Sequence, residues 1–269
     1  MKNQIIKDFG YEWKIYSHNH DNLKNVRSIF FKYFFDKKFF KKKYNTMLDL
    51  GCGSGRWSYF ASKYTKKLIC CDGSVEALRV AKKNLKDKKN VTFIKSSIEN
   101  LKLKNKIDFC FSLGVIHHTE SPEKNLIKVY NLLDKKGIFL MYFYYDLDNK
   151  SKFYKIIWKF SNFFRLFISQ LPNTLKYIVC LNIAIFIYFP LARIAKILHL
   201  FKIDIKNFPL NFYKDKSFYT MKNDALDRFG TKLEHRWSKK KIKKELIRVG
   251  FNKVVFSKKE PFHTCYAIK

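Results

Sequence analysis

Three glycines spaced two residues apart, Gly51, Gly53 and Gly55, directly follow a short apolar run. That run, residues 47–50, predicts a buried strand, and a helix is expected to begin near Arg56. Glycine has no Cβ, so such a turn leaves backbone amide groups bare, and the helix that follows adds the positive end of its dipole. The stretch therefore predicts a turn at which the backbone comes close to a ligand.

An acidic residue ends the next predicted strand, where residues 68–71 are apolar and lead into Asp72. A doubly wound fold places a carboxylate at this point to accept both hydroxyls of a ribose. Helix capping is the alternative role, but Ser74 is able to cap the following helix. The glycine spacing differs from the dinucleotide-binding pattern G-x-G-x-x-G, because Arg56 stands in place of its third glycine.

Two adjacent histidines, His117 and His118, follow the fourth predicted strand, and His235 lies in the C-terminal segment. Imidazole titrates near neutrality, so these side chains could orient a substrate or take a proton from it. Neighbouring side chains point in different directions, so one of the pair is expected to be packed. We expect His117 to be the one that faces the pocket.

The segment LDLGCGSG, residues 48–55, resembles motif I of the class I S-adenosylmethionine (SAM) dependent methyltransferases. The segment SLGVIHHTESP, residues 112–122, is similar to the loop after the fourth strand in their small-molecule branch, the methyltransferase type 11 group. The resemblance covers about residues 47–145 and 224–269. It implies an α/β fold with a Rossmann-like, doubly wound, seven-stranded sheet that is mostly parallel and has an antiparallel last strand.

The resemblance implies SAM as the cofactor and assigns two sets of contacts to it. One set surrounds the methionine end and the ribose, and the other approaches the adenine, where Ser97 stands in place of the acid that the family commonly carries. The residues expected to bind the cofactor are Asp49, Gly51, Cys52, Gly53, Gly55, Asp72, Gly73, Ser97, Ile98 and Ser112.

Two other segments are candidates for substrate contacts. The aromatic N-terminal stretch, with Trp13 and Tyr16, resembles the segment that folds over the pocket as a lid, although an aromatic helix docked on the sheet is an equal alternative. Near the C-terminus, Asp227, His235 and Arg236 precede the closing helix, where the family lines its acceptor pocket. A surface ion pair is the alternative role of Arg236.

Four regions follow from these patterns: an N-terminal helical lid (1–46), a SAM-binding core (47–145), a hydrophobic and basic helical insertion (146–220) and the C-terminal part of the sheet (221–269). Within the insertion, residues 153–171 predict a basic amphipathic helix. The uncharged run 177–192 is shorter than the ~20 residues of a spanning helix, so we expect it to be buried or interfacial. A cap over a lipid-like substrate, contact with an anionic membrane and a dimer interface all remain open for the insertion.

The chain is strongly basic, with 55 lysines and arginines against 22 acidic residues. Such an excess suggests nucleic acid or an anionic membrane, but the joint abundance of Lys, Asn, Ile, Phe and Tyr also fits a base-composition bias of the gene. The six cysteines show no metal-ligand spacing, so we expect buried free thiols and no metal site. The polar N-terminus lacks the pattern of a signal peptide, and we expect a cytoplasmic protein, at most peripheral to a membrane.

These observations predict a SAM-dependent methyltransferase that methylates an oxygen of a small molecule, a glycan precursor or a lipid-linked acceptor, with His117, His118 and His235 as candidate bases. The alternative is a methyltransferase-fold protein that modifies or binds RNA. The sequence has no [ND]-P-P-[YF] motif, and Cys110 lies inside a strand, which argues against base methylation and makes nucleic acid an unlikely partner. A nicotinamide-dependent oxidoreductase is disfavoured by the missing third glycine.

Overall fold

The structure, a computed structural model, describes residues 2–17, 20–144, 146–147, 151–258 and 263–269. These residues form two compact units. The first unit comprises residues 1–146 and 233–269, and the second comprises residues 147–232.

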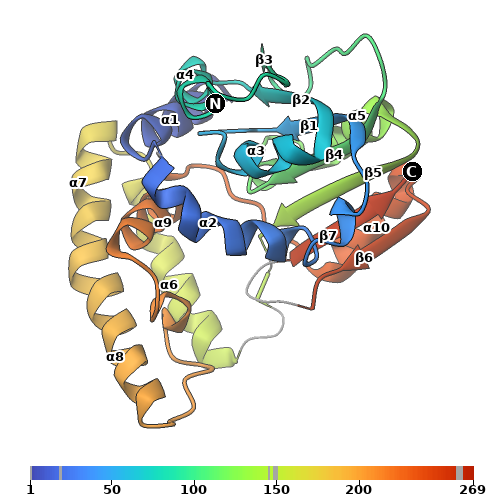
Figure 1. The fold of residues 1–269 in the computed structure, drawn as a ribbon. Helices are drawn as coiled ribbons and strands as arrows, with labels where there is room; N and C mark the ends of the chain where they lie inside the picture. Colours follow the sequence, from blue (N-terminus) through green and yellow to red (C-terminus); the bar gives the residue numbers. More distant parts are fainter. Residues whose placement is uncertain (1, 18–19, 145, 148–150, 259–262) are drawn as a thin grey trace. The chain divides into compact units, whose positions relative to one another are not determined.

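The first unit is built on one seven-stranded sheet with the order β3-β2-β1-β4-β5-β7-β6 (Figure 1). Strands β1 to β5 are parallel to their neighbours, and β7 runs antiparallel to both β5 and β6. This confirms the predicted seven-stranded sheet with an antiparallel last strand. The strands are β1 (Tyr44–Leu50), β2 (Thr65–Asp72), β3 (Val91–Lys95), β4 (Ile107–Leu113), β5 (Leu133–Phe143), β6 (Lys253–Phe256) and β7 (His263–Ile268).

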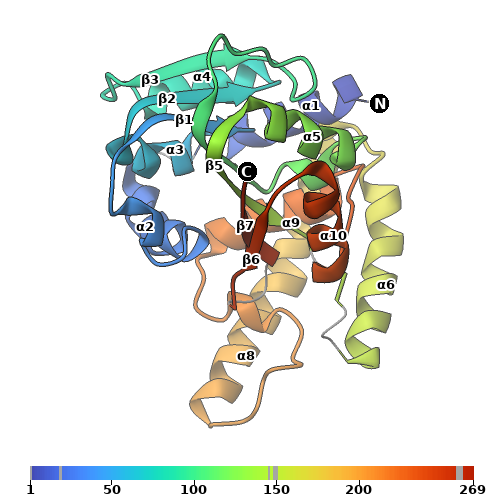
Figure 2. The ribbon, with the colours of Figure 1, turned by 90° about the vertical axis from the view of Figure 1, so that its right-hand side faces the viewer.

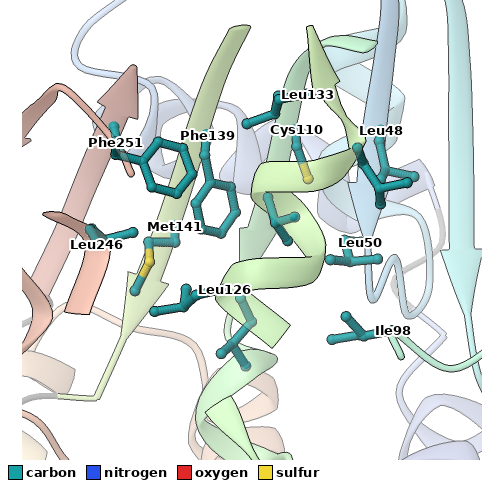
Figure 3. Packing of buried hydrophobic residues seen from close by; sticks show 14 of the residues in the cluster. Leu48, Leu50, Ile98, Cys110, Leu126, Leu133, Phe139, Met141, Leu246 and Phe251 are labelled. Atoms are coloured by element: carbon teal, nitrogen blue, oxygen red, sulfur yellow. The ribbon is translucent and has the colours of Figure 1, made fainter. Parts of the chain in front are cut away.

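Helices cover both faces of this sheet, because successive strand residues point to opposite sides. Met47 packs with the helices α2, α3 and α4 on one face, whereas Leu48 and Leu50 pack with α5 and α10 on the other (Figure 3). The helices and short helical turns of this unit are α1 (Lys2–Ile15), α2 (His20–Tyr33), η1 (Lys38–Phe40), α3 (Arg56–Ala61), η2 (Ser62–Tyr64), α4 (Val75–Asn84), η3 (Ile116–His118), α5 (Pro122–Leu132) and α10 (Lys239–Val249).

Local sequence fixes where the core helices begin and end. Ser74 caps α4 by accepting from the backbone N–H of Ala77, and Ser238 caps α10 in the same way. Pro122 stands in the first turn of α5, where its missing N–H costs nothing. Gly250 ends α10 with a left-handed backbone. The carboxyl ends of β1, β2, β4 and β5 therefore reach the same edge of the sheet with short, ordered connections.

The second unit consists of helices and no strands among its described residues. Its elements are α6 (Lys152–Ile168), α7 (Asn173–Ile183), a π-helical turn η4 (Ala184–Tyr188), α8 (Phe189–Leu200), η5 (Asn211–Tyr213) and α9 (Phe218–Gly230). Both α6 and α7 pack against α9. The chain therefore returns to the first unit at Leu233, after α9, and not at residue 221 as the sequence pattern suggested.

The predicted amphipathic helix is present as α6. The uncharged run 177–192, in contrast, is part of a helix that extends beyond the run at both ends. Segments α7, η4 and α8 form one continuous helix of 28 residues, Asn173–Leu200, long and apolar enough by length and composition to cross a membrane. Pro190 does not end it because the turn before the proline widens to the π form, which accommodates the missing backbone donor.

Candidate functional site

The glycine turn after β1 is hydrogen-bonded to the end of β2. The N–H groups of Gly51 and Cys52 both donate to the carbonyl oxygen of Cys71, at 2.8 and 3.0 Å. Gly51, Gly53 and Gly55 have φ angles of +82°, +52° and +76°, a left-handed conformation that other residues rarely adopt. The predicted turn is therefore present, and its backbone conformation accounts for the three glycines.

Asp72 connects this turn to the start of α4. One carboxylate oxygen accepts from the N–H of Gly53 and the other from the N–H of Ser74, each at 2.9 Å. Burial raises the pKa of the Asp72 carboxyl, while the hydrogen bonds from these two N–H groups lower it. Each oxygen keeps a further lone pair, so the carboxylate is able to accept ribose hydroxyls as well.

Asp49 lies beneath the turn and faces α3. Its side chain is 1% exposed and accepts a hydrogen bond from the Ser58 hydroxyl at 2.6 Å. Burial raises the pKa of this carboxyl to about 7, with the Ser58 hydrogen bond lowering it and the nearby Asp72 raising it. The side chain joins β1 to α3 through Ser58, and its place beside the methionine end of the cofactor stays a prediction.

The other residues predicted to bind the cofactor differ in what they offer. The hydroxyl of Ser97 is buried and has no hydrogen-bond partner among the described residues, and Ile98 beside it is buried. In contrast, the Ser112 hydroxyl already donates to the carbonyl oxygen of Leu50 at 2.9 Å, so it joins two strands. The thiol-bearing Cys52 is almost completely buried.

Helix α1 covers the carboxyl edge of the sheet. The indole of Trp13 lies so close to Gly53 that a Cβ on this glycine would come within 2.7 Å of it. The guanidinium of Arg56 lies 5.2 Å from the centre of the same indole. One helical turn earlier, the Phe9 ring lies 5.1 Å from the His118 ring. Thus α1 contacts both the glycine turn and the histidine pair.

Tyr16, the second aromatic residue predicted to contact substrate, lies just beyond the end of α1. Its side chain is 2% exposed, and its backbone N–H donates to the carbonyl oxygen of Glu12 at 2.8 Å. The ring is therefore packed within the first unit, which agrees with the alternative of a docked aromatic segment, and its contact with substrate stays a prediction.

His117 is completely enclosed by aromatic rings. The Tyr144 ring stacks on it at 3.9 Å, and His118 and Phe143 lie 4.2 and 5.2 Å away. Neither ring nitrogen has a hydrogen-bond partner among the described residues. Burial, followed by the charges of His118 and Arg236, holds the pKa of His117 well below its usual range. The expectation that His117 is the histidine open to the pocket is therefore wrong, because Tyr144 and its neighbours surround it.

The other two histidines have their tautomers set by backbone carbonyls. Nδ1 of His118 lies 2.8 Å from the carbonyl oxygen of Leu233, and Nε2 of His235 lies 3.0 Å from that of Thr119. A carbonyl oxygen only accepts, so each of these nitrogens carries the proton. In the neutral rings the lone pairs then lie on His118 Nε2 and His235 Nδ1. His235 is only half-buried.

The C-terminal segment brings His235 and Arg236 to the histidine pair. The backbone N–H of His235 donates to the carbonyl oxygen of His117 at 2.8 Å. Arg236 forms an ion pair with Glu234 at 2.6 Å, and its guanidinium lies 5.1 Å from the centre of the Tyr144 ring. Three histidines and an arginine, predicted from distant parts of the sequence, thus meet at one place.

Asp227, the remaining predicted substrate contact, lies on α9 in the second unit and is not among the residues that the first unit brings together. The sequence analysis also missed Tyr144 and Glu234, which hold the ring of His117 and the guanidinium of Arg236. A signal for Tyr144 was present, because it directly follows β5 and must reach the same sheet edge as the glycine turn.

Fold and site together define a nucleotide-binding α/β fold with a ligand site at the carboxyl ends of its parallel strands. Residues 48–141 match the family model described as a methyltransferase domain. The probable S-adenosylmethionine-dependent methyltransferase CRG1 of Saccharomyces cerevisiae is 29% identical over 112 residues, which are 40% of this chain and 38% of the yeast protein. Residues 48–141 are thus similar to a methyltransferase domain, and the chain spans about two fifths of the length of that relative.

Solved structures share the fold at low sequence identity. A proposed O-methyltransferase from Nostoc punctiforme superposes with a TM-score of 0.54 and 11% identity, over 96% of this chain and 60% of that protein. Magnesium protoporphyrin IX methyltransferase from Synechocystis, solved with bound S-adenosylhomocysteine (SAH), superposes with a TM-score of 0.50 and 14% identity, over 92% and 83% of the two chains. These likenesses establish the Rossmann-like methyltransferase architecture.

The residues at the sheet edge fit SAM. Gly53 has the left-handed backbone of a turn that exposes its amide groups, the Asp72 carboxylate has lone pairs for two ribose hydroxyls, and the Ser97 hydroxyl is a buried polar group without a partner among the described residues. Gly51, Gly53 and Asp72 would hold the methionine and ribose portions, and Ser97 with the backbone of Ile98 would hold the adenine.

Replacement of Gly53 by valine is expected to abolish SAH binding, measured by isothermal titration calorimetry. The valine would have to adopt φ near +52° and would clash with the Trp13 indole. Gly250→Ala is the matched control, because it introduces comparable strain at φ +117° at the end of α10. We expect this control to lower the melting temperature and keep SAH binding. Unaltered binding by the Gly53 variant would refute the assigned cofactor site.

Asp72→Ala is expected to weaken SAH binding by about 10- to 100-fold for each charged hydrogen bond lost, since such a bond contributes about 1.5–3 kcal/mol. The same titration measures this effect. Asp87→Ala serves as the control because Asp87 is exposed and follows α4 on the surface. Equal affinities of the Asp72 and Asp87 variants would show that the carboxylate does not contact the ligand.

Asp49 is expected to make the free energy of unfolding fall as the pH rises from about 4 to about 7. The folded carboxyl keeps its proton up to a pKa of about 7, whereas an unfolded aspartate releases it near ~3.9. The folded state therefore binds more protons in this window, with a slope of up to about 1.4 kcal/mol per pH unit. Urea unfolding at several pH values should show a smaller slope for Asp49→Asn, and no such change for Asp87→Asn.

Proposed function

We propose that this protein transfers a methyl group from SAM to an oxygen atom of a small acceptor molecule. The supporting observation is that two features lie at one edge of the sheet. One is the glycine turn held by Asp72, and the other is the cluster of three histidines; helix α1 contacts the turn and the His118 ring of this cluster. The domain match supports the cofactor and the reaction class, while the acceptor is inferred from the chemistry of the histidine cluster.

Bound SAM supplies a methyl group on a positively charged sulfur, which is a good leaving group. The chain then has to align the acceptor, and such positioning contributes on the order of 7–11 kcal/mol to lowering a barrier. Helix α1 is suited to this role because its Trp13 and Phe9 side chains lie against the turn and the histidine pair respectively. Closing this edge also keeps water away from the transferred group.

A hydroxyl acceptor must lose its proton during the transfer. Among the three predicted histidines, His235 is best placed for this task, because it is half-buried and its Nε2 hydrogen bond to Thr119 leaves the Nδ1 lone pair for the substrate. His118 carries its lone pair on Nε2 but is 4% exposed, and His117 is enclosed. We therefore assign proton acceptance to His235, with His117 and His118 holding the surrounding rings in place.

The acceptor classes that we propose are a small molecule, a glycan precursor and a lipid-linked molecule. No N-methylation motif of the base- or glutamine-modifying type follows β4, where the sequence reads SLGVIHHT. The apolar helices of the second unit favour the lipid-linked acceptor among the three.

The test uses the full chain with methyl-labelled SAM and two sets of acceptors, an aqueous small-molecule extract and a lipid extract. We expect label in an oxygen-linked product, seen as release of labelled methanol by base for an ester or as a methyl ether by mass spectrometry, and less label with Asp72→Ala at limiting SAM. An N-methyl product would refute the oxygen acceptor.

His235→Gln is expected to lower kcat by about 10²- to 10⁴-fold, the usual contribution of a general base, with SAH affinity unchanged in calorimetry. His199→Gln is the control, because His199 is exposed in the last turn of α8. A His235 variant as active as the His199 variant would remove His235 from the mechanism.

A further inference from the structure

Exposed apolar side chains concentrate in the second unit. Of the 21 large hydrophobic residues that are exposed among the described residues, all but Val75, Ile127 and Ile247 lie between Phe153 and Ile203. Soluble proteins rarely expose contiguous apolar surface of this extent unless it binds another molecule. The second unit therefore carries an interaction surface that the methyl-transfer site does not explain.

Helix α6 contributes one part of this surface. Phe153, Phe160, Phe163 and Phe167 recur at helical spacing on its outer side and are each more than half exposed. The inner side carries Arg165, which is buried and donates to the carbonyl oxygen of Thr231 at 2.7 Å. The aromatic side of α6 thus points away from the unit, while the only charge in its second half points inward.

The long helix Asn173–Leu200 contributes the other part. Small residues, Cys180, Ala184, Ala192 and Ala195, form its buried side. Its α7 and η4 segments pack on α9. The remaining sides expose large apolar residues, with Phe186 72% exposed. Only about a quarter of the most apolar stretch of this helix is buried within the structure (28%). Most of this apolar helix therefore has no protein covering it.

Charge is distributed unevenly over the same unit. Residues 147–232 contain twelve lysines and three arginines against five aspartates and no glutamate. Between Phe160 and Ile194 the three charged residues are Arg165, Lys176 and Arg193; the first two are buried, and Arg193 donates to two backbone carbonyls.

Exposed lysines lie where α6 begins and α8 ends, and Figures 1 and 2 place these two helix termini at the same end of the unit. The residues concerned are Lys152, Lys196, Lys202 and Lys206; Asp204 lies between the last two, and Asp215 forms an ion pair with Lys196 at 3.7 Å. The surface is thus largely apolar along the two helices, with Lys159 exposed on α6, and lysines outnumber aspartates at one end of it.

We propose that the second unit docks on an anionic lipid bilayer, with the outer sides of α6 and of helix Asn173–Leu200 entering the boundary between headgroups and acyl chains. An apolar helical surface bordered by lysines is suited to this boundary, because the lysines contact lipid phosphates while the phenylalanines leave water. This inference does not depend on the methyl-transfer chemistry.

The structure favours docking over crossing and over self-association. The small-residue side of the long helix is covered by α9, which carries Lys222, Asp224 and Arg228, so lipid cannot surround the helix while this packing persists. The lysines at one end of the surface favour lipid over a second copy of this chain, because anionic headgroups neutralise them, whereas a second copy brings further lysines and no glutamate in this unit.

The test is flotation of the full chain with vesicles of phosphatidylcholine, with and without phosphatidylglycerol. We expect the wild-type protein to float with the anionic vesicles, less so at high salt, and not to resist extraction at alkaline pH. Phe160→Ser combined with Phe163→Ser and Phe167→Ser should lower the partition coefficient by about tenfold or more, because the lost apolar contact with lipid drives docking. These positions are exposed, so the fold should tolerate serine.

The matched control is Ile127→Ser combined with Ile247→Ser, which removes exposed apolar side chains from α5 and α10 of the first unit. This variant should float like the wild type. Absence of flotation with anionic vesicles, or equal flotation of the phenylalanine variant, would overturn the proposal. Resistance to alkaline extraction would replace docking by a spanning helix, and a dimer in sedimentation that the serines disperse would assign the surface to a second copy. SAH binding, unaffected by these serines, separates these results from any failure of the proposed function.

Discussion

The carboxylate of Asp72 is the contact on which the site depends. It accepts from Gly53 and from Ser74, so the turn after β1 and the first turn of α4 are held to the end of β2 by one side chain. This arrangement requires a left-handed turn of glycines. Because Gly53 has no Cβ, the Trp13 indole is able to pack directly against it. The position of α1, and through Phe9 its contact with the histidine pair, follows from the same turn.

Much of the first unit could be predicted from the sequence, because its strands are short apolar runs bounded by glycine, proline and capping serines. The positions of the strands and helix caps follow from that pattern, whereas the seven-stranded sheet with its antiparallel last strand was implied by the resemblance to the methyltransferases and is confirmed. The direction of individual side chains did not follow. His117 was expected to be open and is enclosed by Tyr144, and Asp49 faces Ser58 beneath the turn. Such orientations are decided by packing between distant segments, which spacing alone does not encode.

The second unit was predicted less well, because the charges, the proline and the apolar residues in its sequence favour different helix lengths and different packing partners. The uncharged run 177–192 suggested a helix too short to span a membrane, yet a π-helical turn before Pro190 lets the helix continue to Leu200. Likewise α9 was assigned to the sheet domain, although it packs with α6 and α7. The amphipathic character of α6 was correctly predicted, since hydrophobic periodicity shows which side of a helix is apolar and which is polar. It does not report whether the apolar side is buried, and here that side is exposed.

The insertion leaves the first unit after Asp146 and returns at Leu233, and the flanking chain segments are joined within that unit. The backbone N–H of Trp237 donates to the carbonyl oxygen of Tyr144 at 3.0 Å, and the carbonyl oxygen of Leu233 accepts from Nδ1 of His118. Segments already held side by side place few demands on the length of chain between them. The hydrogen bonds that hold the histidine cluster thus also close the first unit at the point where the second unit is inserted, so the first unit does not need residues 147–232 to hold these two segments together.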